Sequence, residues 1–561
     1  MVNRIITFLN KEFRGVNEAA LLLGGFAFLS QLLGLVRDRT LAHIVGAGPV
    51  LDVYYAAFRI PDFLYISIAS LASITVLMPF LVEKINSGNG YDKAKNFLNN
   101  VFSAYMIFMV SISIVIAILM PYIVSYIVPG FSEEQKALLI TTSRIMLLSP
   151  IFIGLSNLIG TITQLFRNFL IFSLSPIFYN IGILFGVIFL YHRIGIYGLS
   201  VGVILGALMH FLVQVPVVIK HKFFPKFITK IRWREIFQVV KLSAPRTLAL
   251  SCNSIAFIFL ISMASTLKQG SISLFTFAYN LQSVPVGIIG ISYSVAAFPI
   301  LVKSFSMKDM DNFIGQIMQA AKQIVFWSLP VITLLIVLRA QIVRVILGSN
   351  SFTWADTRLT AASVSLFVIS LATQGLVLLF VRGYYAAGNT KKPLFINVSS
   401  SVMVIVFAKI LIFIFSHYPL VLSKLEIILR VKDVPGTIML ALPMAYAMGS
   451  LLNFFLIWIM FKKDFLCEKN ISLSKTFIQS FLAAITMGLT AYISLGFLNN
   501  MFDLDTGLEV FLQGFISGTF GILLGVFVLY LLKNKEFFDL IHALRNKFWR
   551  NRVLAPEQGE L

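Results

Sequence analysis

The sequence predicts an all-α protein that crosses a membrane about fourteen times. Hydrophobic residues make up 58% of the 561-residue chain and charged residues only 12%, which is about half the charged fraction of a soluble domain. Apolar runs of ~20 residues recur along the chain, and each is long enough to cross ~30 Å of hydrocarbon. Many runs contain Gly, Pro and Ser, which favours membrane helices over barrel strands.

Fourteen apolar runs are expected to be transmembrane helices. The first run lacks a small-x-small cleavage site and continues directly into a charged, turn-rich segment, so we expect it to remain as a span rather than to be removed as a signal. The fourteen centres lie near residues 30, 67, 110, 148, 180, 206, 250, 287, 327, 370, 404, 449, 484 and 520.

Short echoes indicate that the chain contains two related halves in the same order. Residues 176–180 read PIFYN, and residues 393–397 read PLFIN. Residues 78–83 (MPFLVE) match residues 298–303 (FPILVK). The first residues of the paired segments are 217 (393 − 176) and 220 (298 − 78) positions apart, so the two offsets nearly agree. Duplicated halves around a central site are the plan of many transporters.

A weaker echo pairs residues 206–211 with residues 449–454. We therefore expect two six-helix lobes related by an internal repeat, plus two C-terminal helices. The expected parts are an N-lobe at 1–219, a basic cytoplasmic linker at 220–241, a C-lobe at 242–465, spans thirteen and fourteen at 466–535 and a basic cytoplasmic tail at 536–561.

The formal net charge of +21 is concentrated beside the predicted spans. Lys and Arg gather after spans six, twelve and fourteen, which lie on one side of the membrane, so the positive-inside rule places both termini in the cytoplasm. A basic chain can also bind nucleic acid. Here the cations flank spans, where they hold the orientation and meet anionic headgroups, so no nucleic-acid partner is expected.

Several ionisable side chains fall within the first two predicted spans. A charge at mid-membrane costs about 2.5–3.5 kcal/mol on insertion scales, so these residues need an explanation. One interpretation is local neutralisation, in which Arg37 or Arg39 pairs with a nearby aspartate. The other is a cationic cavity for an anionic head group, because the planar fork of arginine suits phosphate. The residues concerned are Arg37, Asp38, Arg39, Asp52, Arg59 and Asp62.

Two further arginines and three helix-breaking residues are candidates in later spans. Arg246 begins span seven and Arg382 lies near the inner end of span ten, where each is either an inner-surface anchor or a ligand contact. Pro61 interrupts span two, and Pro285 with Gly287 interrupts span eight. Such breaks either allow lobes to rock as hinges or kink a helix for packing.

Signs of catalysis or metal binding are weak. Asp503 and Asp505 resemble a short metal-binding pair but lie in a small loop, and no Walker loop is present. A membrane enzyme, such as a polyprenyl-dependent glycosyltransferase or ligase, would need clustered acid/base or metal groups at a membrane face. Cys252 and Cys467 lack disulfide or metal-ligand spacing. We expect His210 to be a hydrogen-bonded packing residue, and we expect neither an enzyme nor a cofactor or bound metal.

One ordered set of short motifs carries a family resemblance. The motifs are residues 34–38 (GLVRD), 46–48 (GAG), Asp52, 57–61 (AFRIP), 280–282 (NLQ), 285–287 (PVG), 297–299 (AFP), 352–357 (FTWADT), 382–386 (RGYYA), Thr390 and Pro393. Over about residues 20–530 the chain resembles the MurJ (MviN) family, the lipid II flippases of the multidrug/oligosaccharidyl-lipid/polysaccharide exporter superfamily.

The resemblance implies a function in peptidoglycan biosynthesis, cell wall biogenesis and cell shape. Such transporters move undecaprenyl-pyrophosphate-linked disaccharide-pentapeptide from the inner to the outer leaflet of the bacterial plasma (inner) membrane by alternating access. Lipid II, membrane lipids and other cell-wall synthesis proteins are the implied partners. Arg37 matches a family cavity arginine that meets the pyrophosphate, and Asp38 and Asp52 match its acidic neighbours.

The chain departs from the family at four positions. Gln31, Tyr65 and Asn280 stand where the family usually has arginine, and Asn389 stands where some relatives carry an aspartate near a proposed sodium site. Arg59 is about 240° round an ideal helix from Tyr65, so it is not a simple replacement. The departures indicate either a rearranged site, with Arg246 or Arg382 taking part, or a different cargo. The alternative cargo is another polyprenyl-linked saccharide, or a drug exchanged for an ion.

Overall fold

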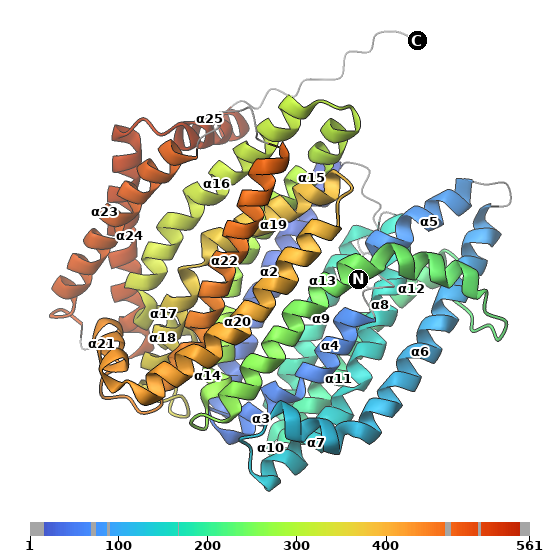
Figure 1. The fold of residues 1–561 in the computed structure, drawn as a ribbon, viewed down its shortest axis with the longest axis horizontal. Helices are drawn as coiled ribbons and strands as arrows, with labels where there is room; N and C mark the ends of the chain where they lie inside the picture. The colour runs from blue at the N-terminus through green and yellow to red at the C-terminus, as the bar shows by residue number, and fades with distance from the viewer. Residues whose placement is uncertain are drawn as a thin grey trace, which may run out of the picture. The chain divides into compact units, whose positions relative to one another are not determined.

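The computed structural model describes most of the chain. Within its ranges the chain is helical and contains no β-strand, which confirms the predicted all-α class (Figure 1). Cys467, Asp503 and Asp505 lie outside the described residues. The described residues are 16–68, 74–86, 90–166, 168–465, 473–502 and 506–549.

The helices follow one another with short connections. Those of the first half are α2 (Val16–Ile44), α3 (Pro49–Ala57), α4 (Arg59–Ser67), α5 (Ile74–Asn86), α6 (Gly90–Ile127), α7 (Glu133–Met146), α8 (Leu148–Leu165), α9 (Phe169–Phe185), η2 (Gly186–Leu190), α10 (Tyr191–Ile194), α11 (Ile196–Leu212), α12 (Val215–Lys220) and α13 (Trp233–Ser265). Those that follow are α14 (Ser271–Pro285), η3 (Val286–Ile291), α15 (Ser292–Ser306), α16 (Met310–Val337), α17 (Arg339–Leu347), α18 (Trp354–Val368), α19 (Leu371–Ala386), α20 (Lys391–His417), α21 (Pro419–Leu429), η4 (Thr437–Leu440), α22 (Ala441–Phe465), α23 (Ser474–Leu498), α24 (Gly507–Leu531) and α25 (Lys535–Trp549).

The predicted count of fourteen spans is not confirmed. Within the described residues, eleven helices are long and apolar enough to cross a membrane, and a twelfth is added if α18 and α19, bent by 43°, form one span. These twelve coincide with the expected spans centred from residue 110 onward. The expected span near residue 30 coincides with α2. The span near residue 67 coincides with α3, α4 and α5, none longer than 13 residues, so each is shorter than a bilayer crossing.

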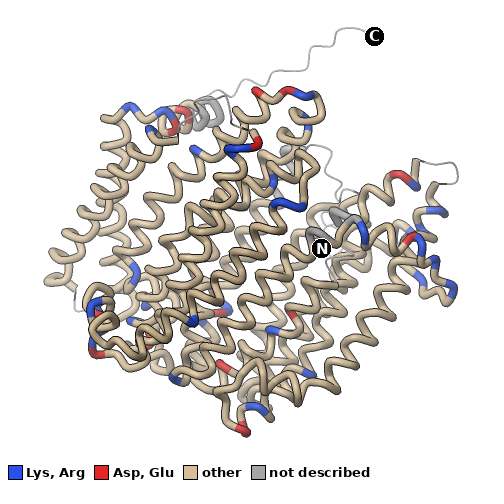
Figure 2. The backbone as a smooth tube through the Cα atoms, in the orientation of Figure 1, with Lys and Arg blue, Asp and Glu red and all other residues tan. Residues whose placement is uncertain are grey.

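The helices form two compact units, which are described separately. Lys and Arg gather mainly at helix ends and in loops, and long stretches of helix carry no charge (Figure 2). The predicted boundaries of the lobes, linker and tail remain a prediction. The first unit comprises Met1–Val284, Val343–Ser370 and Gly388–Ile457, and the second comprises Pro285–Ile342, Leu371–Ala387 and Trp458–Leu561.

In the first unit, α9 and its continuation η2 meet α11 through glycines. A Cβ atom added to Gly182 would lie 2.3 Å from the Cα of Gly206, and one added to Gly186 would lie 2.5 Å from the Cα of Gly202. The glycines recur every four residues, so they lie along one face of each helix. Small residues allow membrane helices to approach at backbone distance, and this contact holds α9 in place.

Replacing Gly202 tests this contact. We expect Gly202→Leu to destabilise the first unit by about 3 kcal/mol or more, because the side chain has no space against Gly186. Thermal unfolding of the detergent-solubilised protein measures the loss. Gly25→Leu in α2 is the matched control, since no atom lies within 4 Å of its added Cβ. Equal unfolding temperatures for the two variants would contradict the assigned role.

The weaker sequence echo corresponds to a similar contact in each half. In α11, a Cβ added to Gly206 would lie 2.4 Å from the carbonyl oxygen of Tyr179 in α9. In α22, a Cβ added to Gly449 would lie 2.1 Å from Cγ2 of Val404 in α20, and the hydroxyl of Ser400 donates to the Gly449 carbonyl at 3.4 Å. The paired glycines therefore lie against the helices that carry the PIFYN and PLFIN echoes.

The basic stretch after α12 is fixed to α6. The carbonyl oxygen of the Asn100 side chain accepts from the backbone N–H of Arg232 at 2.8 Å, and Ser103 Oγ accepts from the backbone N–H of Ile228 at 2.7 Å. These bonds satisfy backbone donors that no regular helix pairs. Most of the predicted linker is thus an ordered loop followed by the first turns of α13.

The second unit begins where a helix break is predicted. Helix α14 ends at Pro285 and continues through Gly287 as the π-helix η3. A Cβ added to Gly290 would lie 2.7 Å from the Cα of Gly375 in α19, so the widened turns pack closely against that helix. Kinks and functional sites are common at π-helical turns. The assignment of Pro285 and Gly287 as hinges remains a prediction.

Candidate functional site

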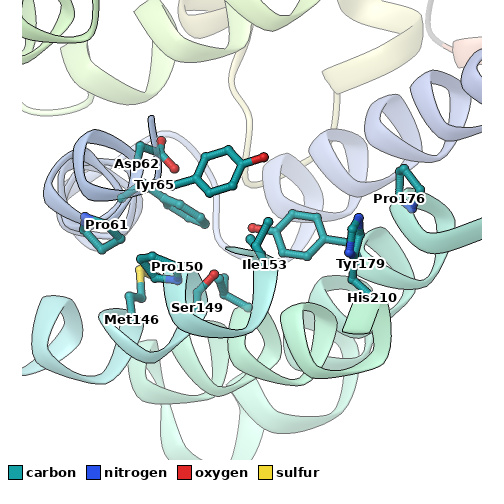
Figure 3. A pocket seen from close by; sticks show the side chains of 12 residues that line it. Pro61, Asp62, Tyr65, Met146, Ser149, Pro150, Ile153, Pro176, Tyr179 and His210 are labelled. Carbon is teal, nitrogen blue, oxygen red and sulfur yellow. The ribbon is translucent and has the colours of Figure 1, made fainter. Parts of the chain in front are cut away.

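Two adjoining pockets lie within the first unit. The arginine pocket, of about 300 Å³, and the tyrosine pocket, of about 260 Å³, share Phe58, Asp62 and Tyr179 in their walls. Figure 3 shows the tyrosine pocket, with Asp62 and Tyr65 of α4 across from Tyr179 of α9 and His210 of α11. The arginine pocket is lined by Arg37, Leu41, Tyr54, Tyr55, Phe58, Arg59, Asp62, Tyr179, Phe257, Thr276, Tyr279 and Asn280.

Arg37 is held by a chain of polar contacts across three helices. Its Nε and Nη2 atoms donate to Asp38 Oδ1 at 3.0 and 2.8 Å, and its Nη1 donates to Asn180 of α9 at 3.3 Å. The second carboxylate oxygen of Asp38 accepts from Asn280 of α14 at 2.9 Å. Asp38 is only 3% exposed. The local neutralisation expected for Arg37 is therefore present, and this arginine carries little uncompensated charge.

Asp52 caps a helix that is distant in the sequence. Its Oδ2 accepts from the backbone N–H of Gly270 at 2.6 Å, and its Oδ1 accepts from the N–H and hydroxyl of Ser273 at 2.8 and 2.6 Å. An acidic group at a helix N-terminus satisfies free donors and complements the dipole. These three bonds fix the start of α14, which carries Asn280. The assignment of Asp52 as a substrate-binding residue remains a prediction.

Among the described residues, Arg39 forms no ion pair with an aspartate. Its Nη1 donates to the backbone carbonyl oxygens of Val345 and Ile346, the latter at 3.3 Å, near the C-terminal end of α17. A cation at this end of a helix interacts favourably with the helix dipole. Of the two pairings considered for local neutralisation, only that of Arg37 is formed.

Arg59 differs from Arg37 because its side chain makes no hydrogen bond to any described residue. Its guanidinium carbon lies 5.0 Å from the centre of the Phe257 ring, a distance at which a cation is attracted to the aromatic face. Its Nε is buried and makes no hydrogen bond to any residue that the structure describes. A buried donor without a partner is costly and uncommon. In the wall of a pocket, such a donor indicates a place for an anionic ligand.

The remaining candidate residues are placed as follows. Arg246 lies in α13, but its side chain is outside the part of the chain whose side chains are described. Arg382 lies in α19 of the second unit. Pro61 is buried in the first turn of α4 and lines the tyrosine pocket. A proline there costs no helical hydrogen bond, so it fits the short break between α3 and α4.

The departures from the resembled family have distinct local environments. Asn280 binds Asp38, as described. Tyr65 accepts from the Asn157 amide at 3.0 Å. The side-chain oxygen of Gln31 is buried without a partner among the described residues, whereas that of Asn389 accepts from the backbone N–H of Lys392 at 3.3 Å. Asn280 thus donates to Asp38 as a neutral side chain, and because it binds Oδ2, Asp38 Oδ1 stays paired with Arg37.

Sequence reasoning did not assign Asn180 to the site. The only signal for it was the repeated PIFYN segment, because Asn180 is the last residue of the echo. Its amide nitrogen also donates to the Pro176 carbonyl at 3.1 Å, so one side chain both supports the helix at Pro176 and orients Arg37. Its role depends on α9 lying beside α2, a contact between residues 143 positions apart.

A fold of many apolar helices with charged side chains lining a pocket among them is typical of a membrane transporter. A sequence model of the family described as "Lipid II flippase MurJ" matches residues 41–512. The chain therefore belongs to the lipid II flippase MurJ family, and the resemblance read from its motifs is confirmed.

Similar proteins and structures agree with this assignment. A probable lipid II flippase MurJ of Buchnera aphidicola subsp. Baizongia pistaciae is 27% identical over 84% of this chain and 87% of its own length. A probable lipid II flippase MurJ of Haemophilus influenzae is 26% identical over 89% of this chain and 98% of its own length. A solved structure of lipid II flippase MurJ in an inward closed conformation has a TM-score of 0.72 at 24% identity, covering 93% of this chain and all of that one. An inward-facing multidrug resistance MATE family transporter of the MOP superfamily has a TM-score of 0.61 at 16% identity, covering 81% of this chain and all of that one. The structural likenesses show the fold.

Proposed function

We propose that this protein moves lipid II from the inner to the outer leaflet of the bacterial plasma membrane by alternating access. Membership of the family supports the cargo. The observation that carries the proposal is Arg59, a guanidinium in the wall of a pocket, with a buried Nε that has no partner among the described residues. The pyrophosphate of lipid II supplies the acceptors that this cation lacks, since arginine and phosphate form paired, charge-assisted hydrogen bonds.

The two arginines have different parts in binding. Arg59 lies against Phe257, and its Nε can donate to a phosphate oxygen without breaking a hydrogen bond to a described residue. Arg59 is therefore the first contact of the pyrophosphate. Arg37 becomes available when a phosphate oxygen replaces Asp38 Oδ1, while Asn280 keeps Asp38 in place through its other oxygen. Asp52 positions Asn280 by capping α14. Arg246 and Arg382 are proposed as further contacts of the head group.

The size of the pocket bears on the transport cycle. A cavity of about 300 Å³ is at the small end of ligand sites and suits a pyrophosphate but not the disaccharide and peptide as well. The rest of the head group therefore requires a more open state, with bends at Pro61, Pro285 and Gly287 as the proposed hinges. The polyprenyl tail stays in lipid, because its burial in a polar cavity would be unfavourable.

The proposed orientation places both termini in the cytoplasm. The loop between α12 and α13 is rich in lysine and arginine, and these cations follow an even number of predicted spans. The positive-inside rule then assigns this loop to the cytoplasmic face. Cysteine labelling from either side of sealed vesicles reads the orientation directly.

Complementation tests the proposed function. We expect the chain to restore growth to a strain depleted of its own lipid II flippase, and to restore access of an external probe to lipid II at the outer surface. Membrane insertion is checked by immunoblot of the membrane fraction. Normal insertion without restored lipid II access would contradict the proposal and favour an exporter of another polyprenyl-linked saccharide.

A further inference from the structure

Asp62 occupies an unusual position between the two pockets. It lines both of them and its side chain is exposed to them. The Asp62 carboxylate accepts no hydrogen bond and forms no ion pair among the described residues. By contrast, the Asp38 carboxylate is bound by Arg37 and Asn280, and the Asp52 carboxylate is bound by Gly270 and Ser273. Asp62 is also three residues after Arg59 in α4, so the two side chains lie on neighbouring positions of one helix face.

The charges of the arginine pocket cancel when Asp62 is ionised. Arg37 and Asp38 neutralise each other through a contact of 2.8 Å. This leaves Arg59, which is positive, and Asp62, which is negative. The four groups sum to zero with Asp62 ionised and to one positive charge with Asp62 protonated. A neutral pocket is a poor receptor for a pyrophosphate, because an ionised carboxylate close to Arg59 repels the same anion that Arg59 attracts.

We propose that Asp62 is a proton-binding site that sets the affinity of the arginine pocket for the pyrophosphate. Proton binding at Asp62 makes the pocket cationic and admits the anion, and loss of the proton from Asp62 promotes release. The inference rests on the proposed function and deepens it, since it couples loading of a lipid diphosphate to a proton at one named carboxylate. No covalent step is involved.

The other titratable groups around Asp62 do not supply this effect. Tyrosine hydroxyls stay neutral up to about pH 10 in water, so they carry no charge that changes near neutral pH. The tyrosines that face the pockets are Tyr54 and Tyr55 of α3, Tyr65 of α4, Tyr179 of α9 and Tyr279 of α14. His210 of α11 lines the tyrosine pocket, where its Nδ1 lies 2.6 Å from Ser156 Oγ. The contribution of His210 is tested separately, by substitution.

A proton suits Asp62 better than a metal cation does. Hard cations are held by several oxygen ligands at once, and sites with one carboxylate are weak. Among the described residues no three His, Cys, Asp or Glu side chains come together. Asp62 is thus a lone carboxylate beside an arginine, an arrangement in which binding of one proton is enough to change the sign of the local charge balance.

Binding of geranyl diphosphate, a soluble prenyl diphosphate, tests the inference. The full-length protein in lipid nanodiscs is titrated from about pH 5.5 to about pH 8.5. We expect the wild-type affinity for geranyl diphosphate to fall roughly tenfold as the pH rises, because ionisation of Asp62 reduces the net charge of the pocket from one positive charge to zero. Asp62→Asn should bind tightly at all pH values, apart from the ligand's own titration, and Asp62→Glu should retain the pH dependence. His210→Gln should behave as the wild type.

A reciprocal measurement identifies the proton. If anion and proton binding are coupled, binding of geranyl diphosphate takes up protons from a weakly buffered solution. We expect uptake by the wild type and less uptake by Asp62→Asn. Identical pH profiles and uptake in these two proteins would overturn the Asp62 inference while leaving the proposed function in place. A wild-type response that follows sodium at fixed pH would also overturn it. Absence of binding by every variant at every pH would overturn the diphosphate site and the inference together.

Discussion

Arg37→Ala should abolish export of lipid II and also weaken the fold of the first unit. The substitution removes an arginine from the pocket wall and leaves Asp38, which is 3% exposed, with Asn280 as its remaining side-chain partner among the described residues. Removing one member of a buried ion pair costs about 3–5 kcal/mol in soluble proteins, because the other charge stays buried and unpaired. In addition, the uncompensated carboxylate repels the pyrophosphate. Outer-surface accessibility of lipid II and thermal unfolding measure the two effects.

A double substitution separates the two effects. Arg37→Ala with Asp38→Asn removes both charges and keeps a polar side chain beside Asn280, so we expect the thermal stability to return close to that of the wild type. Export should remain low, because the second cationic contact is still missing. Full export by the single variant would contradict the role of Arg37 as a phosphate contact. Equal stability of single and double variants would contradict the burial argument.

The fold class was predictable because a bilayer imposes a simple length and polarity requirement on each crossing. The later spans all coincide with helices or with the bent pair α18 and α19, since each is an apolar run of ~20 residues. The region around Pro61 was not predicted in detail. There the chain divides into α3, α4 and α5, and hydropathy averaged over a span does not register breaks of one or a few residues.

The candidate site was only partly predictable from sequence. Charged residues in apolar runs identified Arg37, Asp38, Asp52 and Arg59, because burial of a charge in a membrane needs a reason. Their partners were not predictable. Asp52 binds backbone groups 218 and 221 residues away, and no local spacing encodes such a contact. Sequence therefore found the charges, but the tertiary contacts decide which of them are already neutralised.

The contrast between the two arginines follows from these tertiary contacts. Both are arginines near the start of the chain, and in the sequence both pair equally well with a nearby aspartate. Asn180 and Asn280 reach Arg37 and Asp38 from α9 and α14 and lock that pair. Arg59 contacts the face of Phe257, and its Nε has no hydrogen-bond partner among the described residues. Arg37 is therefore paired within the fold before a ligand binds, whereas Arg59 is not, so we expect removal of Arg37 to reduce stability and removal of Arg59 to leave it unchanged.

Arg59→Ala should weaken binding of the pyrophosphate about 100-fold without loss of stability. In the free protein the buried Nε of the guanidinium has no partner among the described residues, so its removal breaks no hydrogen bond to them and relieves the cost of burying a polar group. We expect a thermal unfolding temperature equal to or slightly above that of the wild type. Two charge-assisted hydrogen bonds to phosphate are worth about 3 kcal/mol or more together, so affinity for geranyl diphosphate should fall about 100-fold.

Arg59→Lys is the matched control for this prediction. Lysine keeps the positive charge opposite Asp62 but loses the planar fork that donates two parallel bonds and stacks on an aromatic ring. We expect an intermediate affinity, about tenfold below that of the wild type, with export reduced rather than lost. A strong fall in the unfolding temperature of Arg59→Ala would show that Arg59 supports the fold, as Arg37 does. In that case the unpaired Nε of Arg59 would no longer indicate an anion-binding site, because Arg59 would then contribute to the stability of the free protein.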